Sequence, residues 1–154
     1  MARLERMTDQ ERKHLEALEC PTFETHPWVA GPPLSERRVA IISTAGLHRQ
    51  DDRPFTFDPG DYYRVISGDI KATDLVMSHV STNFDHSGFQ QDWNVLFPID
   101  RLHELAQDGT IGSVADFHYS FMGAVDPVQM EQEARTLAGI IKKDNVDALL
   151  LLPV

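Results

Sequence analysis

The sequence has one cysteine, few basic residues and no long apolar run. Because Cys20 is the only cysteine in 154 residues, neither an internal disulfide nor a four-cysteine zinc site can form. The 14 Lys and Arg residues stand against 24 Asp and Glu, and a net charge of −10 argues against a nucleic-acid partner. The longest apolar stretch, Ala148 to Leu152, is far shorter than the roughly 20 residues that cross a bilayer. We therefore expect neither a membrane protein nor a nucleic-acid-binding protein.

Several signature motifs are also absent. The sequence contains no GxGxxG or GxxxxGK[ST] loop for a nucleotide and no GxSxG turn for a serine hydrolase. Its seven histidines show no HxH, HxxxH or HExxH spacing, so a metal-dependent enzyme that uses the histidines is only an alternative. The N-terminus alternates charged residues and has no apolar h-region, so we expect a cytoplasmic protein.

The composition that remains is that of a globular protein, with 42% hydrophobic and 25% charged residues. Residues 1–37 form a predicted extension. It begins with a helix over 8–19, where Thr8 and Glu11 have capping-box spacing, and continues as a proline-rich arm anchored by Phe23 and Trp28. Cys20 lies in this arm and is expected to be a small buried residue.

Residues 38–154 alternate apolar strands with polar loops and helices, as in an α/β domain. Asp126 and Pro127 predict the start of a helix over 127–143, because they suit the N-cap and the first helical position. The other expected elements are strands at 39–42, 63–66, 74–79 and 146–154 and a helix from 98 to Gly109. The pattern predicts a mostly parallel, doubly wound, Rossmann-like three-layer sheet that is incomplete at its C-terminus.

Polar side chains follow the predicted strands where each strand ends. Ligands bind beyond the carboxyl ends of strands in open α/β sheets, so these side chains are candidates for a pocket. Arginine pairs with carboxylates in a bidentate manner, and histidine donates or accepts protons near neutral pH. The candidate substrate-binding residues are Ser43, Thr44, His48, Arg53, Arg64, His79, Asn83, Asp85, His118 and Ser120.

Seven segments carry a resemblance to a known family. They are STAGLH (43–48), DRPF (52–55), YRVI (63–66), SHVSTNFD (78–85), NVLFPIDRL (94–102), HYSFMG (118–123) and VDALLLLPV (146–154). In this order they resemble the selenoprotein B family of glycine, sarcosine, betaine and D-proline reductases. The arm that contains Cys20 is similar to that of the short, stand-alone members.

The resemblance implies reductive cleavage of a substrate C–N bond by a thiolate or selenolate. It also implies a dithiol electron donor, a small carboxylate or amine substrate, and partner subunits that supply a pyruvoyl group. In the family, a selenocysteine or cysteine followed by a second cysteine comes directly after the strand matched here by ALLLLPV (148–154). We therefore expect the catalytic residue, a selenocysteine or a cysteine, to be encoded immediately after Val154. The 154 residues alone are then expected to show no redox turnover.

The preferred interpretation is therefore a reductase subunit. The first alternative is a non-catalytic subunit that binds a small molecule or assembles a complex at the same strand edge, and the second is the metal enzyme. An apolar strand at the end of the chain also predicts a homo-oligomer, because an uncovered strand tends to pair with another chain.

Overall fold

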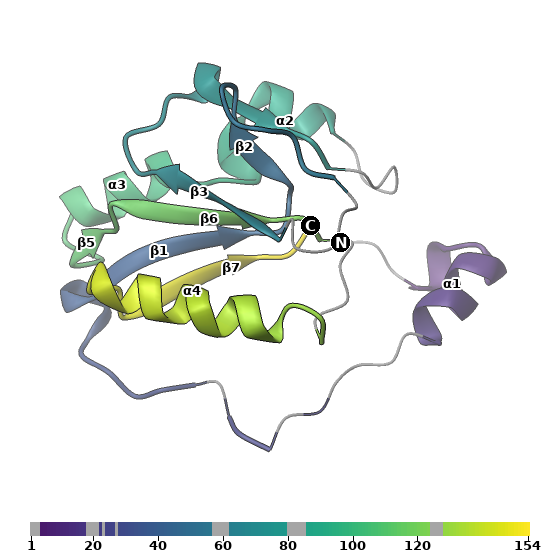
Figure 1. The fold of residues 1–154 in the computed structure, drawn as a ribbon, viewed down its shortest axis with the longest axis horizontal. Helices are drawn as coiled ribbons and strands as arrows, with labels where there is room; N and C mark the ends of the chain where they lie inside the picture. Colours follow the sequence, from purple (N-terminus) through teal and green to yellow (C-terminus); the bar gives the residue numbers. More distant parts are fainter. Residues whose placement is uncertain are drawn as a thin grey trace. The chain divides into compact units, whose positions relative to one another are not determined.

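A computed structural model describes residues 4–17, 22, 24–26, 28–56, 62–79, 86–123 and 128–154 of the chain (Figure 1). The chain divides into two compact units, Met1–Ala30 and Gly31–Val154. Within the described ranges, no helix combines the length and apolar character that a membrane crossing requires.

The first unit contains the helix α1, Asp9–Glu16. Its start confirms the predicted capping box: the Glu11 N–H donates to Thr8 Oγ1 over 3.3 Å, and the Thr8 N–H donates to the Glu11 carboxylate over 2.9 Å. Cys20 and Phe23 lie outside the described residues. The Trp28 side chain is 85% exposed, and its role as an anchor of the arm stays a prediction.

The second unit is built around β1, Arg38–Ser43, in the middle of a sheet. β7, Ala148–Leu152, runs parallel to β1 on one side, with Ile41 opposite Leu150. On the other side, β1 pairs in parallel first with β5, Ser113–Val114, and then with β6, Phe117–Phe121. The predicted strands at 39–42 and 146–154 are thus confirmed as parallel neighbours; β1 is largely buried, whereas the residues of β7 are partly or fully exposed.

The main sheet is mixed: among the described residues the pairings of β1 are all parallel, as expected, but one antiparallel pair departs from the Rossmann-like pattern. β3, Tyr63–Ser67, is antiparallel to β6 along its whole length. A parallel partner would need a crossover of a dozen or more residues, usually helical, whereas the segment from β1 to β3 contains no helix among its described residues. The chain therefore enters β3 from the edge at which it left β1.

The predicted strand at 74–79 forms outside this sheet. β4, Leu75–Met77, pairs antiparallel with β2, Leu47–Arg49, in a separate two-stranded sheet. Register places His48 opposite Val76. The expectation of one doubly wound sheet is therefore wrong for this strand, because it pairs with residues 47–49, for which the sequence predicted no strand.

Helices cover both faces of the main sheet. Val39 and Ile41 of β1 pack on one face with Ile99 and Leu102 of α3, Ile99–Gln107. Ala40 packs on the opposite face with Leu137 and Ile141 of α4, Glu131–Lys143, which runs along the sheet in Figure 1. The remaining helices are α2, Ser87–Gln91, and the short 3-10 helices Leu4–Arg6, Leu34–Glu36, Ala72–Asp74 and Trp93–Val95.

The two predicted long helices differ in how well the sequence placed their ends. α3 ends as expected before Gly109, whose φ of 77° suits glycine. α4 begins at Glu131 rather than at 127, because residues 128–130 form a turn; Asp126 and Pro127 lie outside the described residues. Within α4, Leu137 and Ile141 are buried, whereas Ala134 and Ala138 are exposed.

Candidate functional site

The carboxyl ends of β1 and β7 are tied together by Thr44. Its backbone N–H donates to the Leu152 carbonyl over 3.0 Å, and its hydroxyl accepts the Val154 N–H over 2.8 Å. The Thr44 carbonyl accepts the N–H of Gly123, which follows β6, over 3.0 Å. A Cβ at Gly123 would lie 2.9 Å from the Val154 carbonyl oxygen, so only glycine allows the segments that follow β1, β6 and β7 to meet this closely.

Gly46 brings the end of β4 to the same edge. Its N–H donates to the Phe121 carbonyl, and its carbonyl accepts the Ser78 N–H, both over 2.9 Å. The φ of Gly46 is 65°, and a Cβ there would lie 3.2 Å from the His79 backbone. The predicted convergence of the segments at 43–48 and 78–79 on one edge is therefore present in the structure.

His48 and Ser78 form a hydrogen-bonded pair at this edge. His48 Nε2 lies 2.6 Å from Ser78 Oγ, and His48 Nδ1 lies 2.7 Å from the Arg49 carbonyl oxygen. His48 is buried at 3% exposure, whereas Ser78 is partly exposed. Sequence reasoning named His48 but not Ser78 as a candidate substrate-binding residue, because two positions thirty residues apart give no local signal that their side chains meet.

Two of the candidate serines point into the protein. Ser120 Oγ accepts the Leu47 N–H over 2.7 Å, and Ser43 Oγ accepts the Ala45 N–H over 3.3 Å. Both residues are fully buried. They hold the turn between β1 and β2 against β6.

Arg64 joins two of the segments that carry the family resemblance. Its buried guanidinium donates to the carbonyl groups of Arg53, Pro54 and Tyr63 over 3.1 to 3.2 Å. It also lies 4.3 Å above the ring centroid of Phe55. In this arrangement Arg64 fixes the loop of Arg53 to β3.

His118 lies inside the sheet, away from the carboxyl edge. It is the second residue of β6 and is fully buried, with its ring edge-on to Phe97 at 5.5 Å between centroids. His118 Nδ1 accepts the Ile41 N–H over 2.9 Å, which completes the ladder of β1 where β5 gives way to β6. Burial lowers the pKa of His118 to about 4, so its ring is neutral at pH 7.

The remaining candidates are divided between described and undescribed parts of the chain. His79 is partly buried beside Gly46, while Asn83 and Asp85 lie outside the described residues. In the part of the chain that the structure describes, no three His, Cys, Asp or Glu side chains come together as metal ligands.

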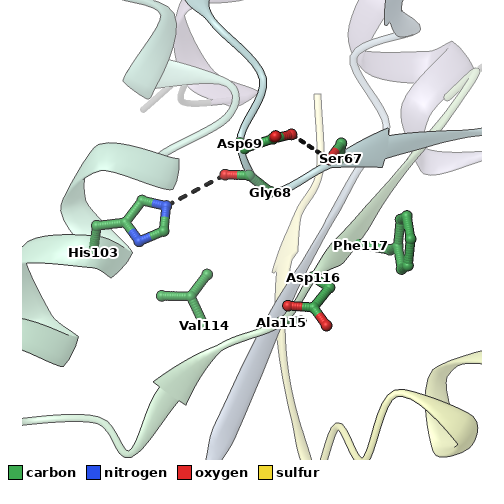
Figure 2. A pocket seen from close by; sticks show the side chains of 8 residues that line it. All are labelled: Ser67, Gly68, Asp69, His103, Val114, Ala115, Asp116 and Phe117. Carbon is green, nitrogen blue, oxygen red and sulfur yellow. Dashed lines mark hydrogen bonds between the residues drawn. The ribbon is translucent and has the colours of Figure 1, made fainter.

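A cleft of about 470 Å³ is shown in Figure 2. The register of β5 with the start of β1, and of the end of β3 with the start of β6, puts this cleft at the opposite end of the sheet from the carboxyl edge. Its walls come from the end of β3, from α3 and from the β5–β6 junction. His103 Nε2 bonds the Gly68 carbonyl over 3.3 Å, and the Ser67 hydroxyl donates to Asp69. The cleft is lined by Ser67, Gly68, Asp69, His103, Val114, Ala115, Asp116 and Phe117, none of which the sequence analysis selected.

Comparison with known proteins identifies relatives over most of the chain. D-proline reductase subunit gamma of Acetoanaerobium sticklandii is 34% identical over 121 residues, which cover 77% of this chain and 49% of that protein. Glycine reductase complex component B subunit gamma of Symbiobacterium thermophilum is 26% identical over 142 residues, or 85% of this chain and 32% of that protein. Betaine reductase complex component B subunit beta of Peptoclostridium acidaminophilum is 24% identical over 123 residues, which cover 77% of this chain and 28% of that protein.

The matched region is about half the length of the first of these relatives and about a third of the other two. No solved structure matches the chain. Residues 7–153 match the family described as glycine/sarcosine/betaine reductase selenoprotein B. The chain therefore belongs to the glycine/sarcosine/betaine reductase selenoprotein B family.

Proposed function

We propose that this chain forms the framework of a selenoprotein B-type reductase site, at the edge where β1, β6 and β7 end. The site acts on a small amino-acid-like substrate by thiol- or selenol-dependent reductive cleavage. The observation that carries the proposal is the position of Val154, which Thr44 holds at the carboxyl edge beside Gly123. In open α/β sheets, catalytic groups lie at this edge, and the family resemblance puts the redox residue directly after this strand.

The redox group itself is proposed to lie outside the 154 residues. Cys20 is the only cysteine of the chain and belongs to the first compact unit, so the sequence contains no pair of thiols for dithiol exchange. A selenocysteine or cysteine after Val154, with a second cysteine close behind it, would supply that pair. Electrons would come from an external dithiol. The 154 residues alone are then expected to bind substrate without reducing it.

Sequencing the coding region beyond codon 154 tests this proposal first. A UGA or cysteine codon at position 155, with a cysteine codon a few positions later, is the expected result. A UAA or UAG codon, or a downstream frame without a nearby cysteine, would refute it. The extended protein, with its expected partner subunits, should then oxidise dithiothreitol in the presence of D-proline, glycine, sarcosine or betaine, whereas the 154-residue chain should not.

A second candidate function is assembly, because the relatives are named as subunits of reductases and of reductase complexes. Within the described residues β7 pairs only with β1, and Leu149 and Leu151 of β7 are 45% and 64% exposed. We propose that β7 pairs antiparallel with β7 of a second copy. A two-fold axis would then set the two α4 helices antiparallel, with the acidic first turn of one near the basic last turn of the other.

A further inference from the structure

The hydrogen bonds of His48 define where its proton lies. A backbone carbonyl can only accept a hydrogen bond, so the 2.7 Å contact between His48 Nδ1 and the Arg49 carbonyl puts the proton of the neutral ring on Nδ1. His48 Nε2 is then unprotonated and accepts the hydroxyl proton of Ser78 over 2.6 Å. An activated hydroxyl is recognised by an imidazole base within hydrogen-bond reach and by an acceptor that orients this base. Ser78, His48 and the Arg49 carbonyl have this arrangement.

The surroundings of the pair hold this geometry in place. His48 lies in β2, opposite Val76 of β4, and Ser78 follows β4 by one residue with its N–H bonded to the Gly46 carbonyl. The imidazole is 3% exposed and cannot itself meet a ligand. Ser78 is partly exposed, so it is the member of the pair that can meet a ligand.

We propose that Ser78 and His48 form an acid–base pair that deprotonates a small thiol bound at the carboxyl edge. The S–H proton moves to Ser78 Oγ while the proton of Ser78 moves to His48 Nε2. The products are a thiolate and an imidazolium that still donates from Nδ1 to the Arg49 carbonyl. The S–H bond is the only bond of the ligand that breaks, and no electrons pass between molecules.

Thiols are the favoured ligand class because the transfer creates an ion pair. The thiolate remains hydrogen-bonded to the Ser78 hydroxyl, and the positive charge of the imidazolium behind that hydroxyl favours the anion, as a nearby cationic histidine does for thiols in proteins. The proton transfer rests on the proposed function in one respect, namely which thiol is bound in the reductase. The pair itself is a property of the 154 residues and can be tested in them.

The test places a thiol directly in the pair. Ser78→Cys in a Cys20→Ser background leaves one thiol, whose alkylation by iodoacetamide is measured at pH 7. An unperturbed cysteine with a pKa near 8.5 is only a few per cent thiolate at this pH, so pairing with His48 is expected to raise the rate about tenfold. His48→Gln in the same background should lose that increase, and His103→Gln, an exposed histidine elsewhere, should keep it.

The alkylation rate must also depend on pH in the right way. With His48 present, the rate is expected to be nearly flat between pH 6 and 8. A rate that rises about tenfold per pH unit, as for a free thiol, would overturn the proposal even if His48→Gln failed to fold. Equal rates with and without His48, in proteins with the same circular dichroism, would overturn it as well. Since neither measurement uses reductase turnover, the outcome is separate from that of the proposed reductase.

Discussion

Replacing Gly46 with alanine tests whether close packing of three segments forms the carboxyl edge. An alanine at the φ of 65° costs roughly 1–2 kcal/mol, because its Cβ crowds the backbone in the left-handed region. The Cβ would also lie 3.0 Å from the Met122 Cε and 3.2 Å from the Cα and N atoms of His79. The Met122 methyl group can turn aside, but the His79 backbone must shift, which adds about 1–2 kcal/mol. We expect a total loss of about 3 kcal/mol in the free energy of unfolding.

Two other glycines provide matched controls for this substitution. Gly109 has a φ of 77°, but a Cβ added there would have no atom within 4 Å, so Gly109→Ala carries only the backbone cost of about 1–2 kcal/mol. Gly139 lies in the exposed face of α4, where a Cβ would also meet no atom within 4 Å, so Gly139→Ala should stabilise the protein by up to about 1 kcal/mol.

Urea unfolding followed by circular dichroism measures all three variants against the parent chain. The expected order of stability is Gly139→Ala above the parent, then Gly109→Ala, then Gly46→Ala. If Gly46→Ala and Gly109→Ala agree within about 0.5 kcal/mol, the contact with His79 contributes nothing and the reasoning about the edge is wrong.

Three further predictions concern the core, the end of β7 and assembly. Burial lowers the pKa of His118 to about 4, below its unfolded value near 6.5, so the unfolded chain binds more protons between these values. The stability that this difference contributes is fully present above pH 6.5 and is lost as the pH falls toward 4. His118→Asn should remove about 3 kcal/mol of the change in unfolding free energy between these pH values, measured by urea titration. An unchanged dependence of the unfolding free energy on pH would contradict this. Thr44→Val should lower the unfolding free energy by about 1 kcal/mol and speed hydrogen exchange of the Val154 amide, because the hydroxyl that accepts this N–H is lost. Thr44→Ser, which keeps the hydroxyl, should exchange as slowly as the parent chain. Equal exchange in the two variants would show that the hydroxyl does not hold the end of β7. Light scattering should show a dimer that Leu149→Lys with Leu151→Lys dissociates, and a monomeric parent chain would rule out pairing through β7.

Local patterns in the sequence were sufficient for several elements of the fold. The capping box of Thr8 and Glu11 marks the start of α1, and Gly109 marks the end of α3. The apolar runs at 39–42 and 146–154 identify two neighbouring strands of the sheet, of which only β1 is largely buried. These features depend on hydrogen bonds and burial within a few residues of each other, so a sequence read in short windows contains them.

The sequence by itself also determined the family, through seven segments in order, and it placed the ends of β1 and β7 at one candidate edge. Only the tertiary structure decided the direction of β3, the separate pairing of β2 with β4, and the different environments of His48 and His118. His118 accepts the N–H of Ile41 inside the sheet, whereas His48 bonds to Ser78 at its edge. The two histidine contacts join residues 77 and 30 positions apart. Their partners are selected by strand register and burial, and no local sequence pattern encodes either.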